Sequence, residues 1–102
     1  MGAMKGEELS AALVVWTGWG ETSWPSRDDS RVVAVYGSDC ALDLLPRLRA
    51  LEDDFYKSEA NLTVADLAEM GRVAATQFRK LHPEITESGV AALAWCYTFD
   101  FK

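Results

Sequence analysis

The spacing of the apolar residues changes at Gly37, and this change constrains the fold more than any other feature of the sequence. After Gly37, apolar side chains recur every three to four residues along residues 41–56. Such a repeat turns one face of a helix toward a core and predicts a helix over residues 40–59. Pro46 is tolerated there if Asp43 caps the helix, because first-turn amides have no helical acceptor; otherwise a short turn over Ser38–Leu45 precedes a kink.

Before Gly37 the sequence favours strands. Leu9–Trp16 is short and apolar, ends in two β-branched residues and an aromatic residue, and is followed by glycines. Arg31–Tyr36 has the same β-branched character and stops at Gly37. Both patterns are typical of strands, and we expect strands over residues 9–16 and 31–36.

Two further helices are expected near the end of the chain. Thr63 and Asp66 have the spacing of a capping box, which predicts a helix over residues 63–82 that Pro83 ends. Thr86 caps a third helix over residues 86–97. In residues 95–101, aromatic residues alternate with other residues, which favours an extended tail after Tyr97 although the helix could continue.

These elements predict an α+β fold, a small two-layer domain in which two N-terminal strands pack with three helices. A length of 102 residues without a linker or repeat indicates one domain over residues 1–102. Met1–Ala3 resembles an expression remnant before a start at Met4.

Sixteen acidic residues against ten basic ones give a formal net charge of −6. This charge repels phosphate backbones and anionic lipids, so we expect no nucleic-acid partner and no membrane partner. Arg72, Arg79 and Lys80 are too dispersed for a nucleic-acid-binding stripe. We also expect neither a secretion signal nor a membrane span, and two reduced thiols, Cys40 and Cys96, which together predict a cytoplasmic protein.

The loop between the two predicted strands, Thr17–Ser30, is the most distinctive segment. Trp19 and Trp24 lie in it, and long loops without secondary structure are often functional. The two rings either form an exposed recognition element or fold back to cover a small core. With Glu21, Asp28 and Asp29 around them, the first interpretation predicts a partner-binding site for a basic protein.

No stretch of the chain carries a catalytic, metal or cofactor signature. Cys40 follows a predicted strand-to-helix junction, where a thiol can be activated, but the only base of the usual kind is His82. A buried structural thiol is the simpler interpretation. His82 has no ligand at metal-binding spacing, and Gly18 and Gly20 lack the third glycine of a dinucleotide site. We therefore expect no catalytic residue, no metal and no cofactor.

The leading hypothesis is a small acidic protein-binding module, of the antitoxin, immunity or adaptor kind, that neutralises a basic partner. A second hypothesis is a small enzyme or ligand-binding domain with a cleft near the tryptophan loop, using Cys40 or Asp39. A third is a homo-oligomer, such as a homodimer, joined through the aromatic tail.

Overall fold

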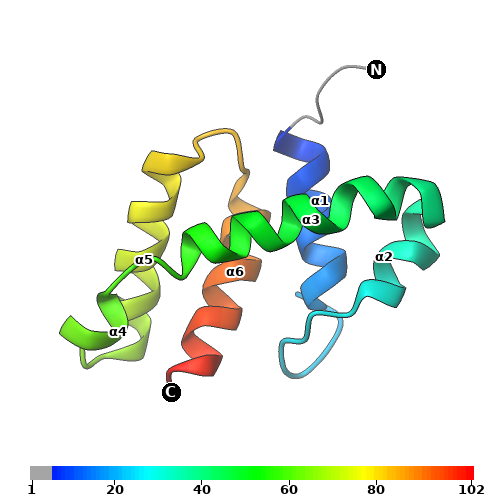
Figure 1. Ribbon diagram of the computed structural model, residues 1–102. Coiled ribbons are helices and arrows are strands. Elements are labelled where there is room, and N and C mark those ends of the chain that lie inside the picture. The colour runs from blue at the N-terminus through cyan, green and yellow to red at the C-terminus, as the bar shows by residue number, and fades with distance from the viewer. Residues whose placement is uncertain (1–5) are drawn as a thin grey trace.

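The computed structural model describes residues 6–102, and this part of the chain is helical throughout, with no strand. Five helices have eight residues or more, and one further helix is a single turn (Figure 1). In chain order they are α1 (Gly6–Thr17), α2 (Asp29–Tyr36), α3 (Ser38–Phe55), the short α4 (Ala60–Thr63), α5 (Leu67–Leu81) and α6 (Glu87–Asp100). The proposed remnant Met1–Ala3 lies outside the described residues.

The predicted α+β fold is therefore wrong, because both expected strands are helices. The segment expected as a strand over residues 9–16 lies within α1, where Leu9, Ala12, Leu13 and Trp16 are buried. These positions follow the three- and four-residue spacing of one helix face, and burial of that face outweighs the weak strand preference of Val14 and Val15.

The second expected strand, residues 31–36, lies within α2. The Asp28 side chain caps this helix by accepting a hydrogen bond from the Ser30 amide, at 3.0 Å. Gly37 ends it with a φ of +86°, a conformation that L-residues with a side chain rarely adopt. The chain then enters α3 directly, so the predicted boundary at Gly37 marks a turn between two helices.

The three expected helices are present with different ends. The helix expected over 40–59 is α3, which begins at Ser38 and holds Pro46 well inside it. Neither an Asp43 cap nor a separate turn is formed. Proline lacks an amide to donate to the carbonyl of Leu42, and Leu42 lies on the exposed face, where water can reach that carbonyl.

The helix expected over 63–82 begins later, at Leu67. Thr63 ends the single turn α4 instead, and Asp66 is the cap of α5: its Oδ1 accepts from the Glu69 amide at 3.0 Å. The capping-box prediction identified the right segment but the wrong capping residue.

The helix expected over 86–97 begins after Thr86, as predicted, but continues to Asp100. The predicted extended tail after Tyr97 is wrong, because the helix continues through it. Tyr97 is buried in the core, where its hydroxyl donates to the Ser58 carbonyl, whereas Phe99 lies on another side of α6.

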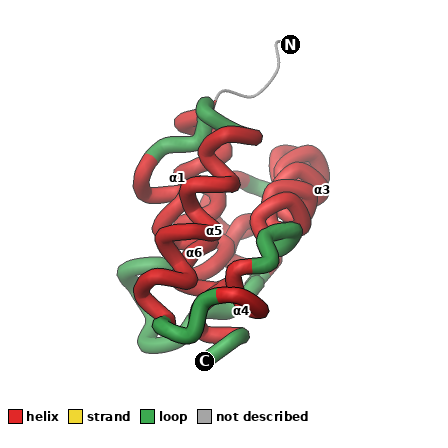
Figure 2. Tube along the Cα trace, turned by 90° about the vertical axis from the view of Figure 1, so that its left-hand side faces the viewer, coloured by secondary structure: helices red, strands yellow, loops and turns green. Residues whose placement is uncertain are grey.

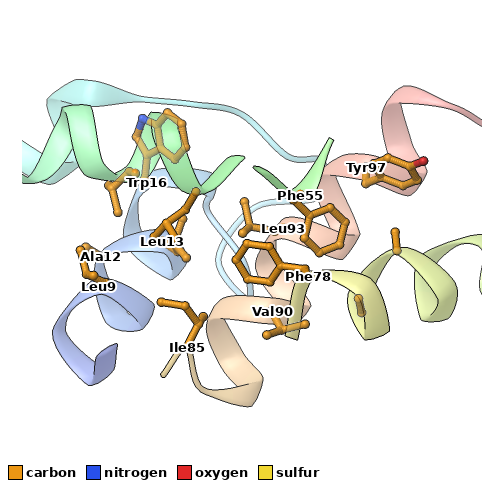
Figure 3. Packing of buried hydrophobic residues seen from close by; sticks show 14 of the residues in the cluster. Leu9, Ala12, Leu13, Trp16, Phe55, Phe78, Ile85, Val90, Leu93 and Tyr97 are labelled. Atoms are coloured by element: carbon orange, nitrogen blue, oxygen red, sulfur yellow. The ribbon is translucent and has the colours of Figure 1, made fainter. Parts of the chain in front are cut away.

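The helices pack in two layers. Helix α6 lies between α1 and α5 and contacts both, while α3 crosses the other side of this layer and contacts α2 (Figures 1 and 2). The buried residues Leu13, Trp16, Phe55, Phe78 and Leu93 fill the space between the layers (Figure 3). Among them, the ring centroids of Phe55 and Phe78 are 5.2 Å apart. None of the helices among residues 6–102 combines the length and apolarity needed to cross a membrane.

Candidate functional site

A groove between α5 and α6 is a concave surface of the described chain. Residues 67–79 of α5 and 87–99 of α6 line it, together with Trp19 and Lys102, and we call it the α5–α6 groove. Its volume is about 690 Å³, and it is open to solvent rather than enclosed.

Small residues form the middle of the groove: Gly71 and Ala75 from α5 and Ala91 and Ala94 from α6. A Cβ atom on Gly71 would lie 3.0 Å from Thr98 Cγ2, so the two helices are close at this point. The floor of the groove at this point is therefore made of short side chains, which leave room for an occupant.

Aromatic rings form one end of the groove. The ring of Trp19, from the loop after α1, lies 5.3 Å from that of Trp95 on α6. Phe99 lies at the same end, and the Lys102 ammonium sits 4.2 Å from the centre of its ring. The loop thus contributes an aromatic side chain to the groove, and this residue, Trp19, is 37% exposed.

The ionisable side chains that line the groove are mostly cationic, whereas the whole chain is acidic. Of the four ionisable side chains that line it, Arg72, Arg79 and Lys102 are cationic and only Glu87 is anionic. Arg72 pairs with Glu69, and Arg79 Nη2 lies 3.0 Å from Glu87 Oε1. These side chains are largely exposed, so the pairs are weak and the guanidinium groups remain available to other anions.

The residues of the predicted recognition loop are not gathered at one site. Trp24 is 65% exposed and Glu21 is exposed, but neither lines the groove. Asp28 caps α2. Asp29 accepts a hydrogen bond from Trp16 Nε1 at 3.0 Å and pairs with Arg49. Two of the three predicted acidic residues thus hold the loop and α2 in place.

A polar cluster fixes the end of the same loop. Arg27 pairs with Glu52 of α3, and its Nη2 donates to Asp100 of α6 at 2.9 Å and to the Tyr56 hydroxyl at 2.8 Å. Burial alone would lower the pKa of Arg27, but the hydrogen bonds to Glu52 and Asp100 outweigh burial and raise it. Burial, followed by the hydrogen bond to Asp100, also raises the pKa of Tyr56. The cluster is a structural clamp with every member engaged.

The residues considered for catalysis are separated. Cys40 is exposed beside a smaller hollow that Glu7, Glu8 and Tyr36 also line, and no histidine is among its described lining residues. The buried Cys96 has a pKa raised to about 12 by burial, which keeps it a neutral thiol. Asp39 is an exposed residue of the first turn of α3.

His82 lies between two carboxylates. Its Nε2 is 2.7 Å from Asp54 Oδ2 and its Nδ1 is 3.1 Å from Glu84 Oε2. The carboxylates occupy opposite nitrogens of the ring, so they cannot share one metal ion with it. Within residues 6–102, no group of three or more histidine, cysteine, aspartate or glutamate side chains could hold a metal ion.

Comparison with known proteins gives no relative: no protein-family model, no curated protein and no solved structure matches the chain.

Sequence reasoning missed most of the groove. The positions of Arg72 and Arg79 in the sequence argue only against a nucleic-acid stripe, and the alternation around Trp95 and Phe99 favours only an extended tail. The available signal was the composition of α6, which is apolar on all its sides, with Ala91, Ala94 and Trp95 opposite its buried face. A helix of this kind is expected to be covered on every side.

Proposed function

We propose that this protein is a non-catalytic, protein-binding module of the cytoplasm and that its α5–α6 groove holds a segment of a partner protein. The observation that carries the proposal is the largely apolar lining of the groove, where Ala91, Ala94 and Trp95 of α6 are only half-buried. Concave surfaces lined mostly by apolar side chains with a few polar groups are the usual binding sites of proteins.

The composition of the groove supports binding. Three large apolar side chains that line it, Trp19, Leu67 and Phe99, are each 37–39% exposed. Aromatic residues and arginine are enriched where interfaces gain most of their binding energy, and this groove offers both. An occupant could bury the rings while pairing with the arginines.

The chemistry of the groove favours binding over catalysis, although it is a cleft near the tryptophan loop as the enzyme hypothesis requires. Among its described lining residues there is no thiol and no imidazole, and its one carboxylate, Glu87, is paired with Arg79. A nucleophile with a base in hydrogen-bonding reach is the usual requirement for covalent catalysis.

The two thiols support the proposed location. Cys40 is exposed and Cys96 is buried, and both are free. Exposed free thiols are typical of proteins in a reducing compartment such as the cytoplasm.

A second candidate surface is the tip of the loop, where Trp24 is 65% exposed beside the acidic Glu21. This acidic surface is complementary to a basic partner, which is the kind of partner expected from the net charge of −6. A role of the antitoxin, immunity or adaptor kind concerns the identity of the partner and stays a prediction.

Selection from a random peptide library displayed on phage tests the proposal. Ala91→Phe adds a ring to the groove floor, and Ala50→Phe adds the same ring to the exposed side of α3 as a matched control. We expect selected peptides to bind the wild type and Ala50→Phe alike and Ala91→Phe about tenfold more weakly. Peptides that bind all three equally, or no selected peptide, would contradict the proposal.

A further inference from the structure

The shape of the groove fits a helix. Residues 67–79 of α5 span about 18 Å along the helix axis, and residues 87–99 of α6 span the same length beside them. The groove is open to solvent, whereas sites for small molecules are usually concave enough to bury most of the ligand. A helix of three to four turns would cover it, in the manner of helices bound in grooves.

The groove offers such a helix two kinds of contact, one at its centre and one at its aromatic end. Its small centre, around Gly71 and Ala91, permits close approach of a helix that carries side chains of leucine size. The aromatic end, with Trp19, Trp95 and Phe99, offers an anchor for one larger apolar side chain.

The charge of the groove selects the partner. Arg72, Arg79 and Lys102 lie along it in a chain that is otherwise acidic. The present carboxylate partners of the arginines, Glu69 and Glu87, are 48% and 88% exposed, so exchanging them for carboxylates of a ligand costs little. Arginine also pairs with carboxylates through two parallel hydrogen bonds, which adds specificity.

Resting on the proposed function, we infer that the occupant of the α5–α6 groove is an amphipathic helix of a partner protein with acidic residues flanking its apolar stripe. This assigns the groove a partner whose charge is opposite to that expected from the net charge of the chain.

A second copy of this chain fits less well. A two-fold contact joins the same surface on both copies, and would place two grooves that each have more cationic than anionic lining residues against one another. Like charges brought together at an interface disfavour the contact. A partner helix with acidic flanks has no such conflict.

Two synthetic, fluorescein-labelled peptides of about 14 residues test the inference by fluorescence anisotropy. Both carry leucines at helical spacing; the flanking positions are glutamates in one and lysines in the other. The acidic peptide is expected to bind the wild type, to bind Arg72→Glu about tenfold more weakly and to be released by added salt. Arg47→Glu is the matched control, because Arg47 is an exposed arginine paired within its own helix, α3, outside the groove.

Several results would overturn the inference. They are failure of the acidic peptide to bind, tighter binding of the basic peptide, or equal weakening by Arg72→Glu and Arg47→Glu. A wild-type dimer in sedimentation that Ala91→Phe dissociates would also overturn it, by identifying a second copy as the occupant. The phage selection distinguishes failure of this inference from failure of the proposed function. If the selected peptides are basic or non-helical but still bind Ala91→Phe more weakly, the acidic helix is refuted and the groove remains the binding site.

Discussion

Asp66 controls where α5 begins. Its carboxylate accepts the Glu69 amide, one of the first-turn donors that have no partner within the helix. We expect Asp66→Ala to lower the free energy of unfolding by about 1 kcal/mol in urea titrations. Thr63→Ala is the control and should change it by less than about 0.5 kcal/mol, because Thr63 is exposed and does not cap α5. The reverse order would place the helix start at Thr63.

His82 links the ends of α3 and α5. Burial alone would lower the pKa of its imidazole, but hydrogen bonds with Asp54 and Glu84 outweigh burial and raise it. Hydrogen bonds from Lys57 and His82 lower the pKa of Asp54, so this carboxylate is ionised at neutral pH. A raised pKa means that the folded chain binds the proton more tightly than the unfolded chain, so protonation of His82 stabilises the fold.

The stabilisation by His82 should depend on pH. It is fully present below the unfolded pKa of about 6.5 and is lost as pH rises through the higher folded pKa. We therefore expect the free energy of unfolding of the wild type, minus that of His82→Gln, to fall as the pH is raised from about 6 into the alkaline range. His82 is the only histidine, so no other imidazole contributes. A difference that stays constant or grows over this range would refute the ion pairs.

At the scale of helices, segments with one clear apolar period were predicted correctly as helices, whereas segments with an ambiguous period were predicted wrongly as strands. The long apolar repeat over residues 41–56 predicted α3. The helix-ending Pro83 and the capping residue Thr86 helped to predict α5 and α6. All three helices are present, with shifted ends. The segment 9–16 has both strand-forming valines and a helical stripe. Its short length hid the helical period, and tertiary burial of Leu13 and Trp16 decides the outcome.

Arg27 joins three elements, since it ties the loop after α1 to α3 and to the end of α6. Its replacement leaves Glu52 and Asp100 without their cation, so Arg27→Gln should lower the free energy of unfolding by about 2 kcal/mol. Arg47→Gln removes an exposed pair within α3 and should cost less than about 0.5 kcal/mol. Equal losses in denaturant titrations would show that the cluster is no clamp.

At the scale of the molecule, the candidate site depends on the order of helices in space. Trp19, Arg72 and Trp95 come from three distant parts of the sequence, and the packing of α6 beside both α1 and α5 gathers them. The net charge of −6 is an average that conceals the cationic groove. The sequence contains the residues of the site, but their common surface follows from tertiary structure.

Mapping of amide chemical shifts on adding the acidic peptide tests the groove most directly. The account predicts perturbed amides along residues 67–79 and 87–99 and perturbed indole signals of Trp19 and Trp95. The exposed side of α3 and the Trp24 indole should be unchanged. Perturbations centred on Trp24 and α2, with none in α5 and α6, would contradict the groove as the binding site.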